Sequence, residues 1–254
     1  MKPAHPNTSI DDLFNHPERF LPSVSVKCAI FSFQDGELLI LLAKFGTIGK
    51  WALPGGLIYN DEDINDAVKR TLYESTRLRD LFFQPFDAFG KVNKQGNQSL
   101  QAYPDGNIAE WMTKRFITIG YYALVEFQKI IPMAHDISLE YSWYRLSEVP
   151  DLMDDHNQII EKALQTLRYH IHYQPICYNL LPAKFPLRDL QVIYEVILGR
   201  HFDRANFQRT MLATNTLERQ DKHFSGKSHR APFLYSFRKN EYFAALRESM
   251  NKVR

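Results

Sequence analysis

The most informative segment of the chain reads Gly56-Leu-Ile-Tyr-Asn-Asp-Glu62-Asp-Ile-Asn-Asp-Ala-Val-Lys-Arg70-Thr71-Leu-Tyr-Glu74-Ser75-Thr-Arg77-Leu78. Its apolar residues recur at helical spacing, at Ile64, Ala67, Val68 and Leu72. This period predicts an amphipathic helix behind a glycine corner that ends the motif Trp51-Ala-Leu-Pro-Gly-Gly56. Asp61 is the expected N-cap, and Asp63 favours the first helical turn.

The flanking segments predict a mixed β-sheet. Residues 24–33 are rich in β-branched and aromatic side chains, residues 34–36 (Gln-Asp-Gly) form a turn signal, and residues 37–44 continue as a second strand. Residues 115–127 are apolar on both faces, as a central strand requires, and residues 142–146 form another strand. We therefore expect a β-hairpin within a larger sheet.

A second helix is predicted over residues 154–169, and it is expected to lead into a linker. Asp154 or Asp155 is placed to cap it. One face carries Ile159, Ile160, Ala163, Leu164 and Leu167. Residues 93–114 are polar and are interrupted by Gly and Pro, so a long loop is expected there.

Length and composition favour two domains in the cytoplasm. The chain has 254 residues, which is enough for two hydrophobic cores. Its two cysteines, Cys28 and Cys177, are far apart and have no metal-site spacing. Neither a secretory leader nor a membrane-spanning segment of roughly 18 apolar residues is recognised.

The charge is divided unevenly along the chain. Residues 183–254 hold 14 Lys and Arg against 7 Asp and Glu, a net charge of +7, while residues 1–182 hold 17 against 22, a net charge of −5. A basic tail suits a polyanion such as DNA, although a solvated surface would explain the charge equally well.

The basic tail also has a pattern of its own. Residues 186–198 predict a helix that stops at Gly199, and Asp203 is the expected N-cap of a second helix with core contacts at Phe207 and Met211. Two helices joined by a tight turn containing glycine are typical of a helix-turn-helix. Short strands at 215–219 and 231–237 flank a basic loop, which indicates a winged helix.

The segment from Gly56 to Leu78 resembles the box of the Nudix family, G-x5-E-x7-R-E-U-x-E-E-x-G-U, where U is apolar. It matches at Gly56, Glu62, Arg70, Leu72, Glu74 and Leu78, and it departs at Thr71, Ser75 and Arg77. In active members the box glutamates hold Mg²⁺, an ion that requires hard oxygen ligands. Two hydroxyls in place of carboxylates predict a sensor that binds its ligand without cleaving it.

The resemblance implies where an effector would bind. The expected effector-binding residues are Lys44, Trp51, Gly56, Glu62, Arg70, Glu74 and Lys91. Alternatively, Gly56, Glu62 and Arg70 serve only to fix the loop-helix geometry. A neutral pocket lined by Thr71 and Ser75 would favour a hydroxyl-rich sugar over a metal-chelated diphosphate. No catalytic residue, metal or cofactor is assigned.

The whole arrangement resembles the NrtR-like transcriptional regulators, whose Nudix-like domain binds ADP-ribose, or L-arabinose in a sugar-responsive branch. The expected architecture is α+β: a lead-in (1–22), a Nudix-like mixed-sheet α/β/α sandwich (23–152), a linker helix and linker (153–182) and a winged helix-turn-helix domain (183–254). The expected DNA-binding residues are Arg204, Asn206, Gln208, Arg209, Lys227, His229 and Arg230.

The predicted function is therefore that of a homodimeric regulator, with repression favoured, in which a small molecule shifts two winged helices on a palindromic operator. Two alternatives remain. One is an active Mg²⁺-dependent hydrolase of a nucleoside diphosphate derivative such as ADP-ribose. The other is a scaffold that docks proteins through the basic tail.

Overall fold

The computed structural model describes residues 17–45, 49–79, 81–91, 114–130, 139–171, 176–222, 233–238, 240–241 and 244. The chain divides into two compact units. Unit 1 comprises Met1–Phe31 and Leu39–Ala163, and unit 2 comprises Ser32–Leu38 and Leu164–Arg254. In the described part of the chain, no helix is long and apolar enough to cross a membrane.

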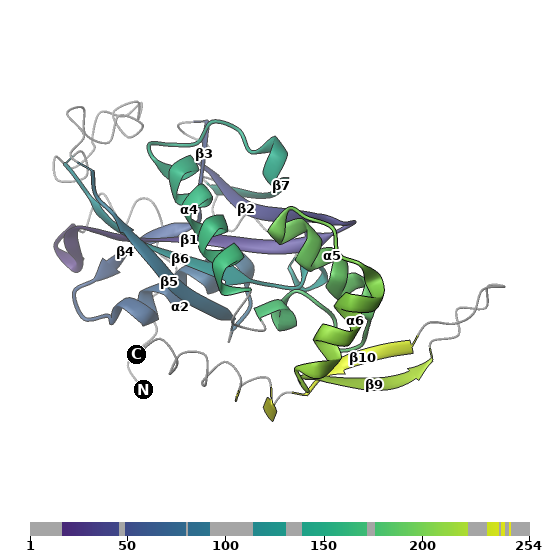
Figure 1. Cartoon of the computed structure of the whole chain (residues 1–254). Coiled ribbons are helices and arrows are strands. Elements are labelled where there is room, and N and C mark those ends of the chain that lie inside the picture. The colour runs from purple at the N-terminus through teal and green to yellow at the C-terminus, as the bar shows by residue number, and fades with distance from the viewer. Residues whose placement is uncertain are drawn as a thin grey trace. The chain divides into compact units, whose positions relative to one another are not determined.

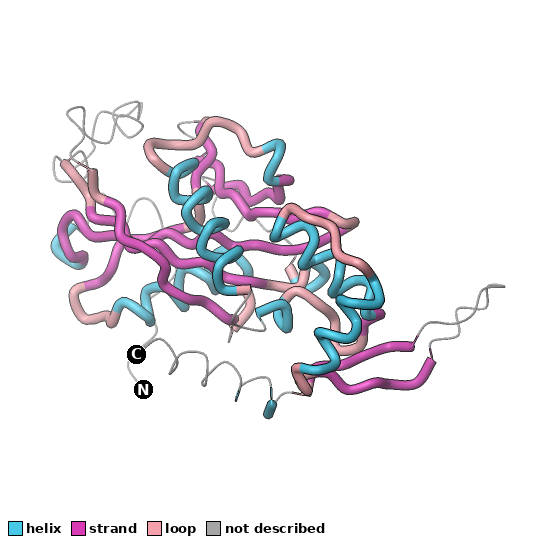
Figure 2. Tube along the Cα trace, viewed as in Figure 1, coloured by secondary structure: helices cyan, strands magenta, loops and turns pink. Residues whose placement is uncertain are grey.

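A mixed sheet forms the centre of unit 1 (Figures 1 and 2). Its strands are β1 (Phe20–Gln34), β2 (Glu37–Phe45), β3 (Lys50–Ala52), β4 (Gly55–Tyr59), β5 (Phe82–Phe89), β6 (Ile117–Leu124) and β7 (Leu139–Arg145). The order is β3-β2-β1-β6-β5, with β4 paired to β1 and β7 paired to β2. The β1–β6 pair is parallel, whereas β4, β5 and β7 pair antiparallel to their neighbours.

The predicted hairpin is confirmed as β1 and β2. Asp35 and Gly36 at its turn have φ angles of 51° and 82°, which is the left-handed geometry that lets a two-residue turn match the twist of its strands. β1 begins at Phe20, inside the stretch expected to be a lead-in, because the Phe20 ring stacks on Tyr59 at 4.6 Å and is 3% exposed. Residues 1–16 of the expected lead-in lie outside the described part.

Two helices cover opposite faces of the sheet, which makes the predicted α/β/α sandwich (Figure 1). α2 (Ile64–Thr76) buries Ala67, Val68 and Leu72 against Val26, Cys28 and Ile30 of β1. α4 (His156–His170) buries the expected apolar face, apart from a partly buried Leu164. The described residues of the unit also include three 3-10 helices: η1 (Pro17–Arg19), η3 (Phe127–Lys129) and η4 (Leu146–Glu148).

Unit 2 has the predicted winged-helix order. It contains η5 (Ile176–Asn179), β8 (Phe185–Pro186), α5 (Leu187–Leu198), α6 (Arg204–Ala213), β9 (Leu217–Lys222) and β10 (Phe233–Phe237). These strands form a three-stranded sheet in the order β8-β10-β9. β8 was not expected, since two residues are too few to give a strand signal.

One cap was predicted wrongly, and one loop cannot be compared. α2 starts one residue after Asp63, which is its N-cap with extended backbone, and not after Asp61. Asp63 makes no side-chain capping bond, and its carbonyl accepts from the backbone N–H groups of Asp66 and Ala67. Most of the polar segment 93–114 lies outside the described residues.

Candidate functional site

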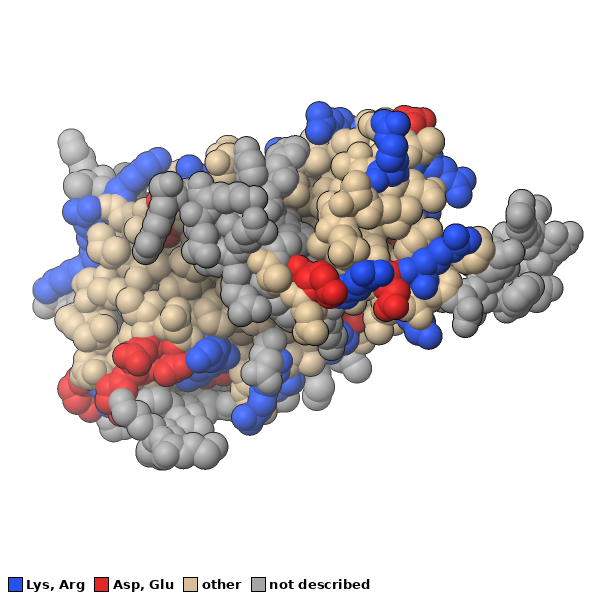
Figure 3. All heavy atoms as spheres, turned by 60° about the horizontal axis from the view of Figure 1, so that its bottom comes forward, with Lys and Arg blue, Asp and Glu red and all other residues tan. Residues whose placement is uncertain are grey.

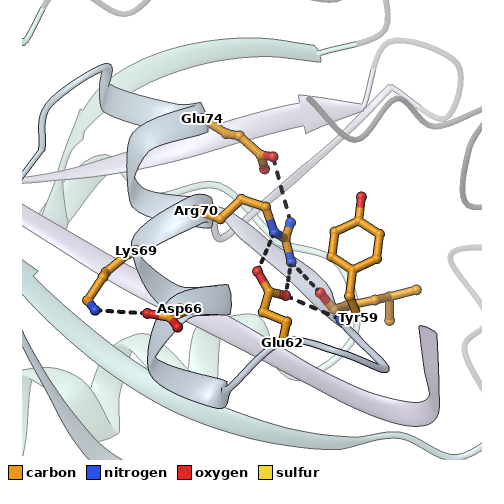
Figure 4. Close-up of polar contacts among 7 residues, drawn as sticks. Tyr59, Glu62, Asp66, Lys69, Arg70 and Glu74 are labelled. Carbon is orange, nitrogen blue, oxygen red and sulfur yellow. Dashed lines mark hydrogen bonds and ion pairs between the residues drawn. The ribbon is translucent and has the colours of Figure 1, made fainter. Parts of the chain in front are cut away.

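Glu62 and Arg70 form a nearly buried clamp behind the glycine corner (Figure 4). Arg70 donates from Nε to Glu62 Oε1 and from Nη2 to Glu62 Oε2, both at 2.8 Å. The two side chains are only 11% and 5% exposed. Glu62 Oε2 also accepts a 3.2 Å hydrogen bond from the backbone N–H of Tyr59. The clamp thus ties the loop after β4 to the first half of α2.

Arg70 has further partners that hold it in place. Its Nη2 donates to the Leu57 carbonyl at 2.7 Å, its guanidinium lies 4.7 Å from the centre of the Tyr59 ring, and Nη1 is 3.7 Å from Glu74 Oε1. Burial alone would lower the pKa of Arg70, but the hydrogen bonds that Arg70 donates to Glu62 and the charges of both carboxylates outweigh it and raise the pKa. These contacts are the ones that the geometric alternative expects of Arg70, and its assignment to effector binding stays a prediction.

The structure corrects the expectation that Thr71 and Ser75 line a neutral ligand pocket. Both side chains are 3% exposed and lie on the buried face of α2. The Ser75 hydroxyl donates to the carbonyls of Thr71 and Leu72 within its own helix. The Thr71 hydroxyl is buried without a hydrogen-bond partner among the described residues. The sugar preference that rested on these two hydroxyls loses its basis.

The box residues fit Mg²⁺ poorly. Glu62 accepts from Arg70 and Tyr59, Glu74 is ion-paired with Arg70, and the other two box positions carry buried hydroxyls. Mg²⁺ demands carboxylate or water oxygens in near-octahedral geometry. A Cβ added to Gly56 would lie 3.2 Å from the Thr71 hydroxyl, so the glycine permits close approach of β4 to α2.

The remaining expected effector residues fall into two further groups. Lys44 lies 5.5 Å from the centre of the Trp51 ring and 3.7 Å from Glu140. Lys91 donates to Gln158 of α4 at 3.0 Å and is exposed. Their contacts are thus separate from the Glu62–Arg70–Glu74 group, and their assignment to effector binding stays a prediction.

Sequence reasoning missed the role of His156. Its Nδ1 accepts a 3.0 Å hydrogen bond from the backbone N–H of Leu53, next to the glycine corner, and its side chain is buried. Burial, with the nearby charge of Lys27, lowers the pKa of His156 well below its ordinary value. A neutral His156 therefore fixes the start of α4 against the β3–β4 corner. Nothing in the sequence around His156, the first residue of α4, indicates that its side chain bonds to Leu53.

The second helix of the helix-turn-helix is exposed around most of its circumference. In α6 only Phe207 is buried, with rings of Tyr194 and Phe202 at 5.4 and 5.7 Å, and Met211 is partly buried. The other expected α6 residues, Arg204, Asn206, Gln208 and Arg209, are exposed. The predicted cap is confirmed, because Asp203 Oδ1 accepts from Asn206 N at 2.8 Å. A helix anchored mainly at one residue leaves most of its side chains exposed to solvent.

Two polar residues on α5 fix the turn between the helices. Gln191 Nε2 donates to the Phe202 carbonyl, and Glu195 Oε1 accepts from the Phe202 N–H, both at 2.9 Å. The bond from Phe202, with a second from Gln191, lowers the pKa of Glu195. Gly199 ends α5 with a φ of 66°, as the predicted stop requires. The Gln191–Glu195 pair was missed because both read as ordinary surface residues.

The predicted wing contacts cannot be placed. Lys227, His229 and Arg230 lie outside the described residues, although the strands on either side, β9 and β10, are described. On the face drawn in Figure 3, Lys and Arg side chains are spread over the surface with Asp and Glu among them. The base-contacting role of α6 and the wing stays a prediction.

Comparison with known proteins matches two segments of the chain to known domain families. The chain matches the NUDIX domain over residues 21–167 and the NrtR DNA-binding winged helix domain over residues 177–237. It is 29% identical over 233 residues to the ADPR responsive transcriptional repressor NtrR of Acinetobacter baylyi, covering 87% of this chain and 84% of that protein.

Comparison with solved structures supports the same two-domain arrangement along the chain. Shewanella oneidensis NrtR complexed with a 27mer DNA has a TM-score of 0.70 at 25% identity, covering 87% of this chain and 95% of that chain. A MutT/nudix family protein from Enterococcus faecalis shares the fold, with a TM-score of 0.63 at 17% identity, covering 91% of this chain and 94% of that one. The chain therefore belongs to the Nudix-related transcriptional regulators, in which a NUDIX domain is followed by an NrtR-type DNA-binding winged helix.

Proposed function

We propose that this protein is a transcriptional repressor of the cytoplasm that binds a palindromic operator as a homodimer and responds to ADP-ribose or a closely related nucleoside diphosphate. The observation that carries the DNA-binding part is α6, a capped helix anchored at Phe207 with Arg204, Asn206, Gln208 and Arg209 exposed. Arg, Asn and Gln match guanine and adenine edges in the major groove.

ADP-ribose replaces a simple sugar as the favoured effector for two reasons. The buried hydroxyls of Thr71 and Ser75 leave no argument for a sugar at the box. The Acinetobacter baylyi relative, 29% identical, is described as ADPR responsive. The proposal also holds that the effector is bound and not hydrolysed, which the commitment of Glu62 and Glu74 to Arg70 supports.

The test is operator binding by the full chain, measured by fluorescence anisotropy with DNA from the region upstream of its own gene. Selective binding that weakens steeply with salt is expected, because phosphate contacts release counterions. ADP-ribose should change the affinity, and L-arabinose at the same concentration should not. Equal affinity for operator and unrelated DNA would refute the regulator, and a response to arabinose alone would refute the effector.

Hydrolysis is tested separately with the same protein. Full-length chain, ADP-ribose and Mg²⁺ are incubated together, and the nucleotides are separated by chromatography. Intact ADP-ribose is the expected result. Mg²⁺-dependent release of AMP and ribose phosphate that disappears in Glu74→Gln would instead support the hydrolase.

A further inference from the structure

Arg77, at the end of the altered box, has an unusual backbone and an unusual side chain. It stands where the Nudix box has glycine, and it is the C-cap of α2 with a φ of 59°. Its backbone N–H donates to the Tyr73 carbonyl at 2.8 Å. Glycine adopts this left-handed conformation without steric cost, whereas an L side chain does not. A strained arginine here calls for a role that glycine lacks.

Two buried donors without acceptors in the described part of the chain lie on the elements that pack together here, α2 and β7. Arg77 Nε and Trp143 Nε1 are buried and have no hydrogen-bond partner among the described residues. Trp143 and Tyr141 are two residues apart on β7, so they share the face of the sheet that packs against α2. Unsatisfied buried donors are costly, and a ligand that supplies oxygen acceptors would remove that cost.

Tyr141 adds a third donor close to Arg77. The pKa of Tyr141 is raised to about 12, mainly by burial and in smaller part by the charge of Glu74, while the charge of Arg77 opposes the shift. Tyr141 packs against the same core cluster as Leu78, the residue that follows Arg77, and its hydroxyl stays protonated at neutral pH.

Positive charge gathers at the same end of α2. The guanidinium of Arg77 lies 5.4 Å from the centre of the Tyr73 ring, and that of Arg79 lies 5.0 Å from the same ring. The nearby carboxylate of Glu74 is already matched by Arg70 at 3.7 Å. Two cations beside one ring repel each other, and an anion that pairs with both would relieve the repulsion.

We propose that Arg77, Arg79 and Tyr141 form an anion site that binds the diphosphate of the effector directly, without a divalent metal. The inference rests on the proposed function and deepens it. The planar fork of a guanidinium matches phosphate oxygens, and two such forks supply the neutralisation that a diphosphate otherwise takes from Mg²⁺. The substitutions at the box thus exchange a metal site for an arginine site.

The decisive variant is Arg77→Gly, because it restores the family's residue and relieves the positive φ. A purely structural Arg77 would make this variant neutral or more stable and leave ligand binding intact. Binding of ADP-ribose, and of inorganic pyrophosphate as a second probe, is measured by calorimetry on the full chain in EDTA and in Mg²⁺. Asp35→Gly, which also relieves a positive φ (51°) but in the β1–β2 turn, is the matched control.

We expect the wild-type protein to bind equally well in EDTA and in Mg²⁺. Arg77→Gly and Arg79→Gln should each lower the affinity at least about tenfold without lowering the melting temperature. Asp35→Gly should leave the affinity unchanged. Unchanged binding in Arg77→Gly, or binding that needs Mg²⁺, overturns the anion site and leaves the proposed function standing. Binding of pyrophosphate but not ADP-ribose, sensitive to Arg77→Gly, supports the site and refutes the effector. Binding of neither probe by wild type overturns both.

Discussion

Arg70 and Glu62 are joined by two hydrogen bonds of 2.8 Å, and neither side chain is more than 11% exposed. The pair lies eight residues apart in sequence, across the loop that leads into α2. It therefore closes the loop-helix segment and engages both oxygens of one box carboxylate.

Glu62→Gln should destabilise the protein by about 3 kcal/mol, because it leaves the buried Arg70 charge without its main counter-ion. Urea denaturation checks this. Asp66→Asn is the control, since the Lys69–Asp66 pair at 2.8 Å is 63% and 58% exposed and should contribute less than about 0.5 kcal/mol (Figure 4). Equal losses in the two variants would contradict the structural role of the clamp.

Thr71→Val should be neutral or stabilise the protein by up to about 1 kcal/mol. The buried Thr71 hydroxyl has no hydrogen-bond partner among the described residues, and valine keeps the same shape without it. Ser75→Ala is the comparison, because it removes a hydroxyl that does bond to the Thr71 carbonyl. A Thr71→Val protein less stable than wild type by more than about 1 kcal/mol would show that the hydroxyl has a partner, such as bound water.

Stability should fall as the pH drops below about 6.5, the ordinary pKa of His156. Its pKa is lowered in the folded state, so the unfolded chain binds the proton first and the stability gained at neutral pH is lost on acidification. The loss should approach about 1.4 kcal/mol for each pH unit below 6.5. His156→Asn, which keeps an acceptor for Leu53 N–H, should flatten the profile of unfolding free energy between about pH 7 and pH 5. A profile as steep as that of wild type would assign the effect to other groups.

Gln191→Ala should destabilise unit 2 by about 1 to 3 kcal/mol, because it leaves the Phe202 carbonyl without the Gln191 donor. Thermal unfolding followed by circular dichroism measures this. Gln208→Ala, at an exposed position of α6, should leave the melting temperature within error. If both changes lower it equally, the turn does not depend on Gln191.

Arg209→Ala should weaken operator binding by about 1 to 3 kcal/mol and relax base preference at one position. Arg209 is exposed on α6 and donates to Asn206 Oδ1 at 2.7 Å, so the two side chains can act together on one base pair. Lys227→Ala should instead lower affinity evenly across sequences, as a phosphate contact does. Anisotropy titrations on operator and scrambled DNA separate the two, and a uniform loss in Arg209→Ala would exclude base contact.

The sequence by itself determined the β1–β2 hairpin, the helices α2, α4, α5 and α6 and their order along the chain, whereas β5 and β8 were not predicted. The period of Ala67, Val68 and Leu72, the Asp35-Gly36 turn and the Asp203 cap are local signals, and each depends on a few neighbouring residues. The spacing of the Nudix-like box and the basic tail likewise predicted an effector-binding domain followed by a DNA-binding domain.

Only the tertiary structure decided what the polar box residues do. Helical spacing puts Thr71 and Ser75 on one face, but that face turns toward the sheet only because Ala67, Val68 and Leu72 dock there. A hydroxyl tolerates either a core or a ligand pocket, so its residue type could not choose between them. The groups that contact Glu62, His156 and Arg77 lie on elements distant in sequence, and they come together only when β4, α2, α4 and β7 pack. No local sequence pattern encodes that packing.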